Sequence, residues 1–234
     1  MKQSLAAEFG IGERELVAFV GAGGKSTLLF RLGDELAERG ATVMLTTTTK
    51  MGTDQARQVR CVAPGAVTAA FDAAGPVMVV ATDDGHKITG PPPDEITALF
   101  ATPGLDHVLV EADGARGQSF KTPADHEPVI PSATTLVVIV VGCDAIGRPI
   151  AEKCHRPELV AALAGKEANE SLDIETMLCV MTHPAGVLRA VPDAARVMVA
   201  LTKAHEARAG EVAELKGRID GSGRFERCVV VRTA

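Results

Sequence analysis

Short, continuous runs of apolar residues recur along the chain, and most are followed by a segment with helical periodicity. The runs occupy residues 16–20, 42–46, 76–81, 107–110, 136–141, 197–201 and 228–231. Because they are continuous rather than alternating, they are typical of strands that are covered on both faces. We therefore predict an α/β fold with a doubly wound, mostly parallel sheet and helices on both faces.

Two of the intervening segments carry a clear helical stripe. After the first run, Leu28, Leu32 and Leu36 recur every four residues, and Gly40 stands where a helix commonly ends. A second stripe near the end of the chain consists of Val212, Leu215 and Ile219. Both stripes predict helices that bury one face against the sheet.

The other glycine- and proline-rich positions predict turns, not a boundary between two domains. Asp84-Gly85 between two apolar segments predicts a hairpin, and Gly90 with three following prolines predicts a rigid connector into a helix near residues 94–100. No long linker or repeat is present. We interpret residues 1–234 as one domain with an irregular helical insertion around residues 144–190.

The strongest chemical signal is a glycine-rich segment between the first predicted strand and the first predicted helix. It reads Gly21, Ala22, Gly23, Gly24, Lys25, Ser26 and Thr27. Glycines let backbone N–H groups approach phosphate oxygens, and a helix that begins near the lysine adds the positive end of its dipole. Lysine supplies a charge for the terminal phosphates, and serine a hydroxyl for Mg²⁺. The context predicts a P-loop NTPase-like domain that binds a nucleoside triphosphate.

The loop is shorter than the standard pattern G-x-x-x-x-G-K-[ST]. That pattern needs a glycine at position 19, where this chain has Phe19. Short loops of the form G-x-x-G-K-[ST], which this one resembles, bind ATP in the Mur-ligase group. Two other readings remain open, a dinucleotide site and a turn without a ligand. The predicted second strand ends without the carboxylate that a dinucleotide site needs, and the adjacent Lys25 and Ser26 favour phosphate binding over both.

A second polar cluster follows the run at residues 107–110. Glu111 and Asp113 stand at the end of this predicted strand, one residue apart, so their side chains share one side. In P-loop proteins, an acid at such a position holds the Mg²⁺ shell or orients a water molecule. We expect Lys25, Glu111 and Asp113 to be the catalytic residues, and Ser26, Glu111 and Asp113 to be the metal ligands.

The second predicted strand ends in four threonines and a lysine. Ligands of doubly wound sheets collect at the carboxyl ends of the strands, so we expect Thr48, Thr49 and Lys50 to contact the nucleotide or a second substrate. Arg116 follows the carboxylates in a glycine-rich loop and is predicted to contribute to the same site. Part of the threonine run has a structural reason as well, because threonine favours strands.

The choice of nucleotide stays open between ATP and GTP. Thr202-Lys203-Ala204-His205 follows the apolar run at 197–201, where many GTPases carry Asn-Lys-x-Asp. His205 replaces the aspartate that recognises guanine, so ATP is the preferred prediction.

Composition narrows the class of protein further. The net charge is −6 and the chain has neither Trp nor Tyr, which argues against a nucleic-acid partner. The longest apolar run, 136–141, is far below the roughly 20 residues of a membrane span, so we expect no membrane partner. The five cysteines form no C-x-x-C pair and the first residues form no secretory signal, so we expect reduced thiols and a cytoplasmic location.

Five segments in register resemble the YqeC family. They contain the glycine-rich loop, Thr46–Met51 as Thr-Thr-Thr-Thr-Lys-Met, Leu-Val-Glu-Ala-Asp-Gly-Ala-Arg-Gly ending at 117, Asp-His-Glu-Pro-Val-Ile-Pro from 125, and His-Arg-Pro-Glu from 155. The resemblance spans roughly residues 15–205. Members of this family are described as accessory proteins of selenium-dependent molybdenum hydroxylases. The resemblance implies a role in maturing such a hydroxylase or its cofactor, with either as a partner.

These observations lead to one preferred function and two alternatives. The preferred one is an ATP- and Mg²⁺-dependent ATPase or transferase that acts in this maturation. The first alternative is a nucleotide-gated chaperone or scaffold with little hydrolysis. The second is a ligase or kinase of a small acid, by the likeness to the Mur-ligase loop.

Overall fold

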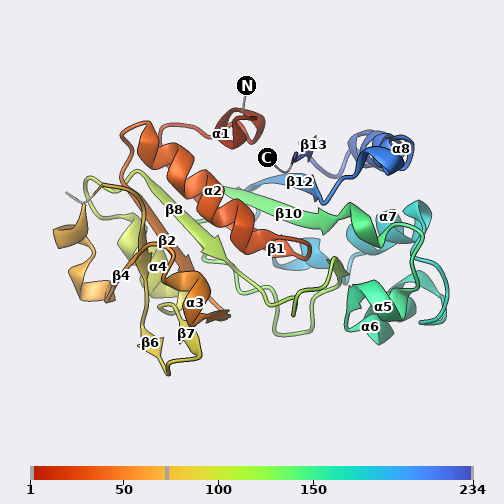
Figure 1. Ribbon diagram of the computed structural model, residues 1–234, viewed down its shortest axis with the longest axis horizontal. Helices are drawn as coiled ribbons and strands as arrows, with labels where there is room; N and C mark the ends of the chain where they lie inside the picture. Colours follow the sequence, from red (N-terminus) through yellow and green to blue (C-terminus); the bar gives the residue numbers. More distant parts are fainter. Residues whose placement is uncertain (1–2, 72–73, 233–234) are drawn as a thin grey trace.

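The computed structural model describes residues 3–71 and 74–232, and a parallel sheet forms the centre of that part of the chain. The main sheet has the strand order β13-β12-β10-β1-β8-β2-β5-β4, and every neighbouring pair is parallel. Its strands are β1 (Glu15–Gly21), β2 (Val43–Thr47), β4 (Arg60–Val62), β5 (Val77–Val79), β8 (His107–Glu111), β10 (Leu136–Gly142), β12 (Arg196–Thr202) and β13 (Arg227–Val230). β1 therefore lies inside the sheet, between β8 and β10 (Figure 1).

The predicted α/β fold with a parallel sheet is confirmed. All seven apolar runs lie on strands of the main sheet, and only the edge strand β4 has no run. β4 is short, and its Arg60 and Cys61 are exposed, so hydrophobic patterning gives no signal for it.

The sheet separates two hydrophobic clusters, because alternate side chains of each strand point to opposite faces. Val17 and Phe19 of β1 belong to one cluster, together with buried residues of α1 (Leu5–Glu8) and α2 (Lys25–Glu38). Ala18 and Val20 belong to the other cluster. That second cluster receives side chains from α4 (Pro93–Phe100), α5 (Ile150–Lys153), α6 (Pro157–Ala164), α7 (Ile174–Thr182) and α8 (Ala209–Gly221).

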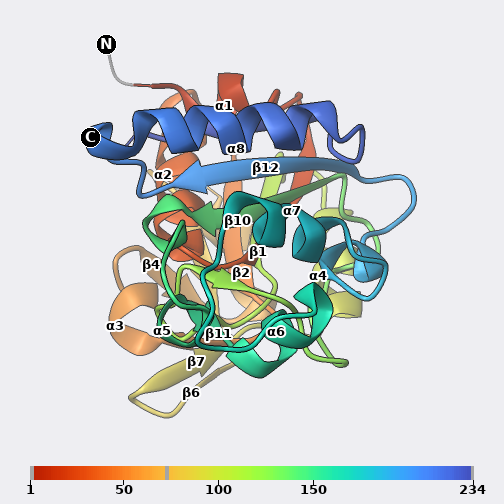
Figure 2. The same ribbon diagram turned by 90° about the vertical axis from the view of Figure 1, so that its right-hand side faces the viewer.

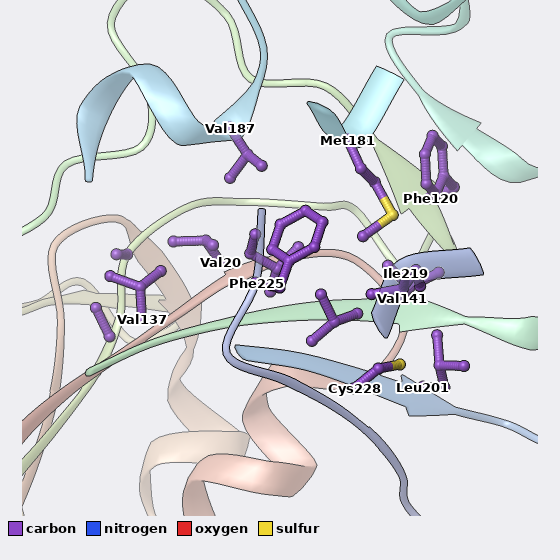
Figure 3. Packing of buried hydrophobic residues seen from close by; sticks show 14 of the residues in the cluster. Val20, Phe120, Val137, Val141, Met181, Val187, Leu201, Ile219, Phe225 and Cys228 are labelled. Atoms are coloured by element: carbon purple, nitrogen blue, oxygen red, sulfur yellow. The ribbon is translucent and has the colours of Figure 1, made fainter. Parts of the chain in front are cut away.

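The predicted stripes of α2 and α8 are the buried faces of these helices. Leu28, Leu32 and Leu36 are at most 4% exposed, and Gly40 follows the end of α2 with a positive φ of 88°. Figure 3 shows Ile219 of α8 and Met181 of α7 close to Val141 of β10, within the second cluster. Fully burying one such aliphatic side chain contributes about 1.5–3 kcal/mol.

The connection between β10 and β12 includes residues 144–190 and contains several short elements. These are η3 (Cys143–Ala145), α5, β11 (Cys154–His155), α6, α7 and η4 (Val187–Ala190). β11 pairs in parallel with β9 (Phe120–Lys121), which ties this segment to the loop after β8. Figure 2 shows α5, β11 and α6 together on one side of the molecule.

A small antiparallel sheet stands beside β2. It has the order β3-β7-β6, with β3 (Lys50–Gly52), β6 (Thr82–Asp83) and β7 (Lys87–Thr89). The predicted hairpin at Asp84-Gly85 is confirmed, since it joins β6 to β7 and Gly85 has a φ of 88°. The remaining elements are α3 (Thr53–Ala56), η1 (Pro64–Ala66), η2 (Thr68–Ala70) and η5 (Glu206–Arg208). No helix within the described residues is long and apolar enough to cross a membrane.

Candidate functional site

The glycine-rich loop joins β1 to α2 and is pressed against β10. Gly21, Gly23 and Gly24 have φ values of 90°, 108° and 123°, which residues with side chains rarely adopt. A Cβ atom on Gly21 would collide with the carbonyl oxygen of Val140, and one on Gly23 would lie 2.5 Å from the backbone nitrogen of Gly142. Glycine is therefore required at 21 and 23 by backbone conformation and by space together.

The loop ends at the amino end of α2, which has no capping side chain. Gly24 is the N-cap residue, and the first turn of α2 contains no acidic residue. The N–H groups of a helix's first turn have no partner within the helix, and the helix dipole makes this end positive. Lys25 in this turn is buried, Ser26 is half-buried and Thr27 is exposed. This helix terminus is suited to an anion.

Two carboxylates, Glu111 at the end of β8 and Asp113 just after it, face the first turn of α2, as the sequence predicts. Ser26 Oγ donates a hydrogen bond of 2.6 Å to Glu111 Oε2. Lys25 Nζ donates to the Gly21 carbonyl oxygen at 2.6 Å and lies 3.1 Å from Asp113 Oδ1 and 4.0 Å from Glu111 Oε1. Asp113 Oδ2 accepts from the Gly21 N–H at 3.0 Å. The loop, the start of α2 and the end of β8 thus form one polar site.

Burial governs the ionisation of Glu111. Desolvation raises the pKa of this carboxyl, while the Lys25 ammonium and the Ser26 hydroxyl act in the opposite direction. A buried carboxylate of this kind gains from an additional cation, because a nearby positive charge favours the ionised form.

A row of alternating charges runs from Lys25 to α6. Asp113 Oδ2 lies 3.1 Å from Lys121 Nζ, which also donates to Glu127 Oε2 at 2.8 Å and to the Gly114 carbonyl oxygen at 2.7 Å. Glu127 in turn accepts two hydrogen bonds from Arg156, at 2.7 and 3.0 Å. The order is Lys25, Asp113, Lys121, Glu127 and Arg156. Sequence patterning gives no signal for Glu127, because its partner Arg156 is 29 positions away in the sequence.

The threonine run supports the site through backbone contacts. The hydroxyl of Thr47 donates to the Glu111 carbonyl oxygen at 2.9 Å, and that of Thr48 donates to the Val129 carbonyl oxygen at 2.7 Å. Thr49 is half-buried, and a Cβ on Gly114 would lie 3.7 Å from its hydroxyl oxygen. Thr47 therefore ties the end of β2 to the end of β8, and Thr48 ties it to the loop at Val129.

Lys50 and Arg116 are placed differently from the loop residues. Lys50 begins β3, pairs with Thr89 of β7 and is exposed, and no hydrogen bond or ion pair joins it to the loop among the described residues. Arg116 is exposed as well, in a left-handed conformation with φ 48° three residues after Asp113.

The end of β12 also touches the loop. Thr202 Oγ1 donates to the Gly23 carbonyl oxygen at 2.5 Å, and Lys203 Nζ donates to Ser119 Oγ at 2.9 Å. His205 is used locally, since its Nδ1 accepts from the Ala207 N–H at the start of η5. Thr202 stands at the first position of the segment compared with Asn-Lys-x-Asp, and this is the sequence signal that could have placed it near the loop.

The cysteines and acids form no separate metal centre within residues 3–71 and 74–232. No group of three or more His, Cys, Asp or Glu side chains is placed to hold a metal ion there. All five cysteines are free, and burial raises the pKa of Cys143, Cys154 and Cys228 to about 12. These three thiols are therefore protonated at neutral pH, which weakens them as nucleophiles and metal ligands.

Fold and site together define a class of α/β protein with an all-parallel main sheet. In this class the inner strand β1 leads into a glycine-rich loop with a lysine, and two buried carboxylates face that lysine. The family model described as YqeC protein matches residues 17–158. The "Uncharacterized protein YqeC" of Escherichia coli (strain K12) is 33% identical over 200 residues, which cover 82% of this chain and 78% of that protein. The chain belongs to the YqeC family. The matched residues contain the loop, both carboxylates and the charge row up to Arg156.

The Glu127 ion pairs predict a specific acid sensitivity. Although burial alone would raise it, the pKa of Glu127 falls to about 2, because Arg156 and Lys121 donate hydrogen bonds to the carboxylate. A lowered folded-state pKa contributes stability above the unfolded value of roughly 4.3, and this contribution is lost as pH falls towards 2. We expect Glu127→Gln to lower the melting temperature at pH 7 and to lose less stability than the wild type between pH 5 and pH 2.5.

The measurement is thermal unfolding by circular dichroism across this pH range. Glu95→Gln on α4, an exposed position, is the matched control and should follow the wild type. Parallel curves for Glu127→Gln and wild type would contradict the prediction.

Proposed function

We propose that this protein binds a nucleoside triphosphate, preferably ATP, together with Mg²⁺ in a short P-loop formed by Gly21–Thr27. We further propose that the nucleotide drives a step in maturing a molybdenum- or selenium-dependent hydroxylase or its cofactor. The observation that carries the nucleotide assignment is the meeting of three features at one point. They are the uncapped amino end of α2, the Lys25-Ser26 pair, and the carboxylates of Glu111 and Asp113. The maturation role rests on the family resemblance.

Each residue has a defined role in this proposal. The N–H groups of the loop and of the first turn of α2 hold phosphate oxygens, and Thr27 lies at the exposed side of the same turn. The Lys25 ammonium neutralises charge that develops on the terminal phosphates. Phosphate oxygens compete for Lys25 with the Gly21 carbonyl oxygen and Asp113, its present partners.

The donor set fits Mg²⁺. Ser26 Oγ and the carboxylates of Glu111 and Asp113 are hard oxygen donors, the kind that Mg²⁺ prefers. Asp113 Oδ1 is buried and accepts no hydrogen bond of good geometry among the described residues, although Lys25 Nζ is 3.1 Å away. Ser26, Glu111 and Asp113 would hold the Mg²⁺ ion, which would neutralise negative charge on the phosphate groups.

One observation favours the alternative of a nucleotide-gated chaperone or scaffold with slow hydrolysis. Asp113 is 1% exposed, and its Oδ2 already contacts the Gly21 N–H and Lys121 Nζ. A carboxylate engaged in this way is a poor base for an attacking water molecule. Phosphate release measured with and without a client hydroxylase separates the two functions, since a scaffold shows little turnover in either case.

Mg²⁺ dependence tests the assignment of Ser26. We expect wild-type protein to bind ATP at least about tenfold more weakly in EDTA than with Mg²⁺, because the ion pairs and Mg²⁺ contacts are charge-assisted. Ser26→Ala should weaken binding of Mg²⁺–ATP by a similar factor and change binding in EDTA much less. Isothermal titration calorimetry measures both.

Ser132→Ala is the matched control, because Ser132 is exposed and lies outside the site. Equal affinities with Mg²⁺ and with EDTA in the wild type would refute the Mg²⁺-dependent site. An unchanged affinity of Ser26→Ala for Mg²⁺–ATP would show that Ser26 is not a ligand of the Mg²⁺ ion.

A further inference from the structure

The residues with left-handed backbone share an unexpected property. Among the described residues other than glycine, those with positive φ are Arg116 at 48°, Lys203 at 51° and Arg156 at 58°, and all are basic. This conformation is unfavourable for residues with a Cβ atom. It persists where the surroundings impose it, and such residues cluster at ligand clamps.

All three residues belong to the surroundings of one loop, residues 113–127. Lys203 Nζ donates to Ser119 Oγ, and the Ser119 N–H donates to the Lys153 carbonyl oxygen at 3.1 Å. The pairing of β9 with β11 then places Lys121 opposite His155, next to Arg156. β11 and the start of α6 therefore adjoin the row of charges that leads to the phosphate loop. Figure 2 shows β11 next to α6.

The carboxylates around the loop at residues 113–127 leave part of the positive charge of the neighbouring basic residues without a partner. Glu127 accepts from both Lys121 and Arg156, and Lys121 is also paired with Asp113, so Lys121 is neutralised while Arg156 shares its only carboxylate partner among the described residues. Arg116 has no hydrogen bond or ion pair among residues 3–71 and 74–232, and its side chain is exposed. Arg156 uses two of the five N–H donors of its guanidinium on Glu127, which leaves three.

His155 lies within this positive field. Its pKa is lowered, first by burial and then by the charges of Arg156 and Lys121, with a smaller contribution from Arg116, while Glu127 acts in the opposite direction. The imidazole is half-buried and forms no hydrogen bond within the described part of the chain. A neutral imidazole still carries one N–H donor.

We propose that Arg116, His155 and Arg156 form a second anion subsite beside the phosphate loop, which binds a phosphate group of the acceptor substrate. That this phosphate belongs to an acceptor substrate rests on the proposed nucleotide function. That the subsite binds phosphate does not depend on it. Guanidinium groups match phosphate with paired hydrogen bonds, and three donor groups suit the three oxygens of a phosphate monoester better than the two of a carboxylate. Lys121 contacts both Asp113 and Glu127, which makes the subsite adjacent to the loop.

The test uses inorganic phosphate as the probe and Lys25→Met as the starting protein, so that the phosphate loop is weakened first. Isothermal titration calorimetry should still detect phosphate binding to Lys25→Met. Adding Arg116→Gly should weaken it about tenfold, the factor expected for a hydrogen bond to a charged group. Adding Arg224→Gly, an exposed arginine between α8 and β13, changes the net charge equally and should have no effect.

Folding does not confound the Arg116→Gly variant. Glycine adopts positive φ freely, so the variant should melt at the same temperature as its parent or higher. Arg156→Lys, which keeps a charge for Glu127 but loses the paired geometry, should also weaken phosphate binding. The subsite is refuted if Lys25→Met binds no phosphate, if Arg116→Gly leaves the affinity unchanged, or if acetate binds as tightly as phosphate. Failure of the wild type to bind ATP, with the Arg116 effect intact, would overturn the nucleotide function alone.

Discussion

Lys25→Met is expected to weaken binding of Mg²⁺–ATP about a hundredfold, because a charge-assisted contact to phosphate contributes up to about 3 kcal/mol. The lysine is 4% exposed and contacts both Asp113 and the Gly21 carbonyl oxygen, so its ammonium group is already held at the loop. Isothermal titration calorimetry is the appropriate measurement, since the chain lacks Trp and Tyr for intrinsic fluorescence.

A change in stability must be separated from this loss of affinity. Removing Lys25 leaves Asp113 with Lys121 and the Gly21 N–H as partners, which should cost about 2 kcal/mol of unfolding free energy. The double variant Lys25→Met with Asp113→Asn removes the unbalanced charge, so it should regain part of the stability without regaining affinity. Lys216→Met on the exposed face of α8 is the control and should match the wild type. Unchanged ATP affinity in folded Lys25→Met would exclude the loop as the nucleotide site.

The second large effect is expected from the glycines of the loop. Gly23→Ala should destabilise the protein by about 4 kcal/mol, because it combines backbone strain with a clash against Gly142. Gly24→Ala has a similar positive φ but meets no atom within 4 Å, so only the strain remains, about 1–3 kcal/mol. Chemical denaturation followed by circular dichroism measures the difference.

Gly217→Ala provides a control of opposite sign. This glycine lies within α8 and has open space around it, so alanine should stabilise the helix by about 0.5–1 kcal/mol. If Gly23→Ala and Gly24→Ala lowered the free energy of unfolding by the same amount, the contact between residue 23 and Gly142 of β10 would not contribute to the cost.

The features that sequence patterning predicted are those set by short-range physics. Seven apolar runs mark seven of the main-sheet strands, since a strand covered on both faces needs a continuous apolar segment. The position of the loop between β1 and α2 follows from local signals as well. The shared side of Glu111 and Asp113 follows from the alternation of a strand, and both carboxylates do face Lys25.

The partners of the site residues belong to the tertiary structure. Thr202 reaches Gly23 across 179 positions of sequence, and Arg156 reaches Glu127 across 29. No periodicity encodes such pairs, because they depend on which strands become neighbours and how loops return over the sheet edge. The threonine run shows the same limit: its residue types suggest ligand hydroxyls, but Thr47 and Thr48 donate to backbone carbonyl oxygens.

By itself, then, the amino-acid sequence determined the strand–helix alternation, the glycine loop and its lysine, and the carboxylates at the end of β8, because each depends on residues near one another in the chain. Only the tertiary structure decided that Lys50 lies exposed on a strand of a separate small sheet, and that Lys121, Glu127 and Arg156 continue the charges of the loop. The physical reason is that charge pairing and burial act through space, between segments that come together only when the sheet is assembled.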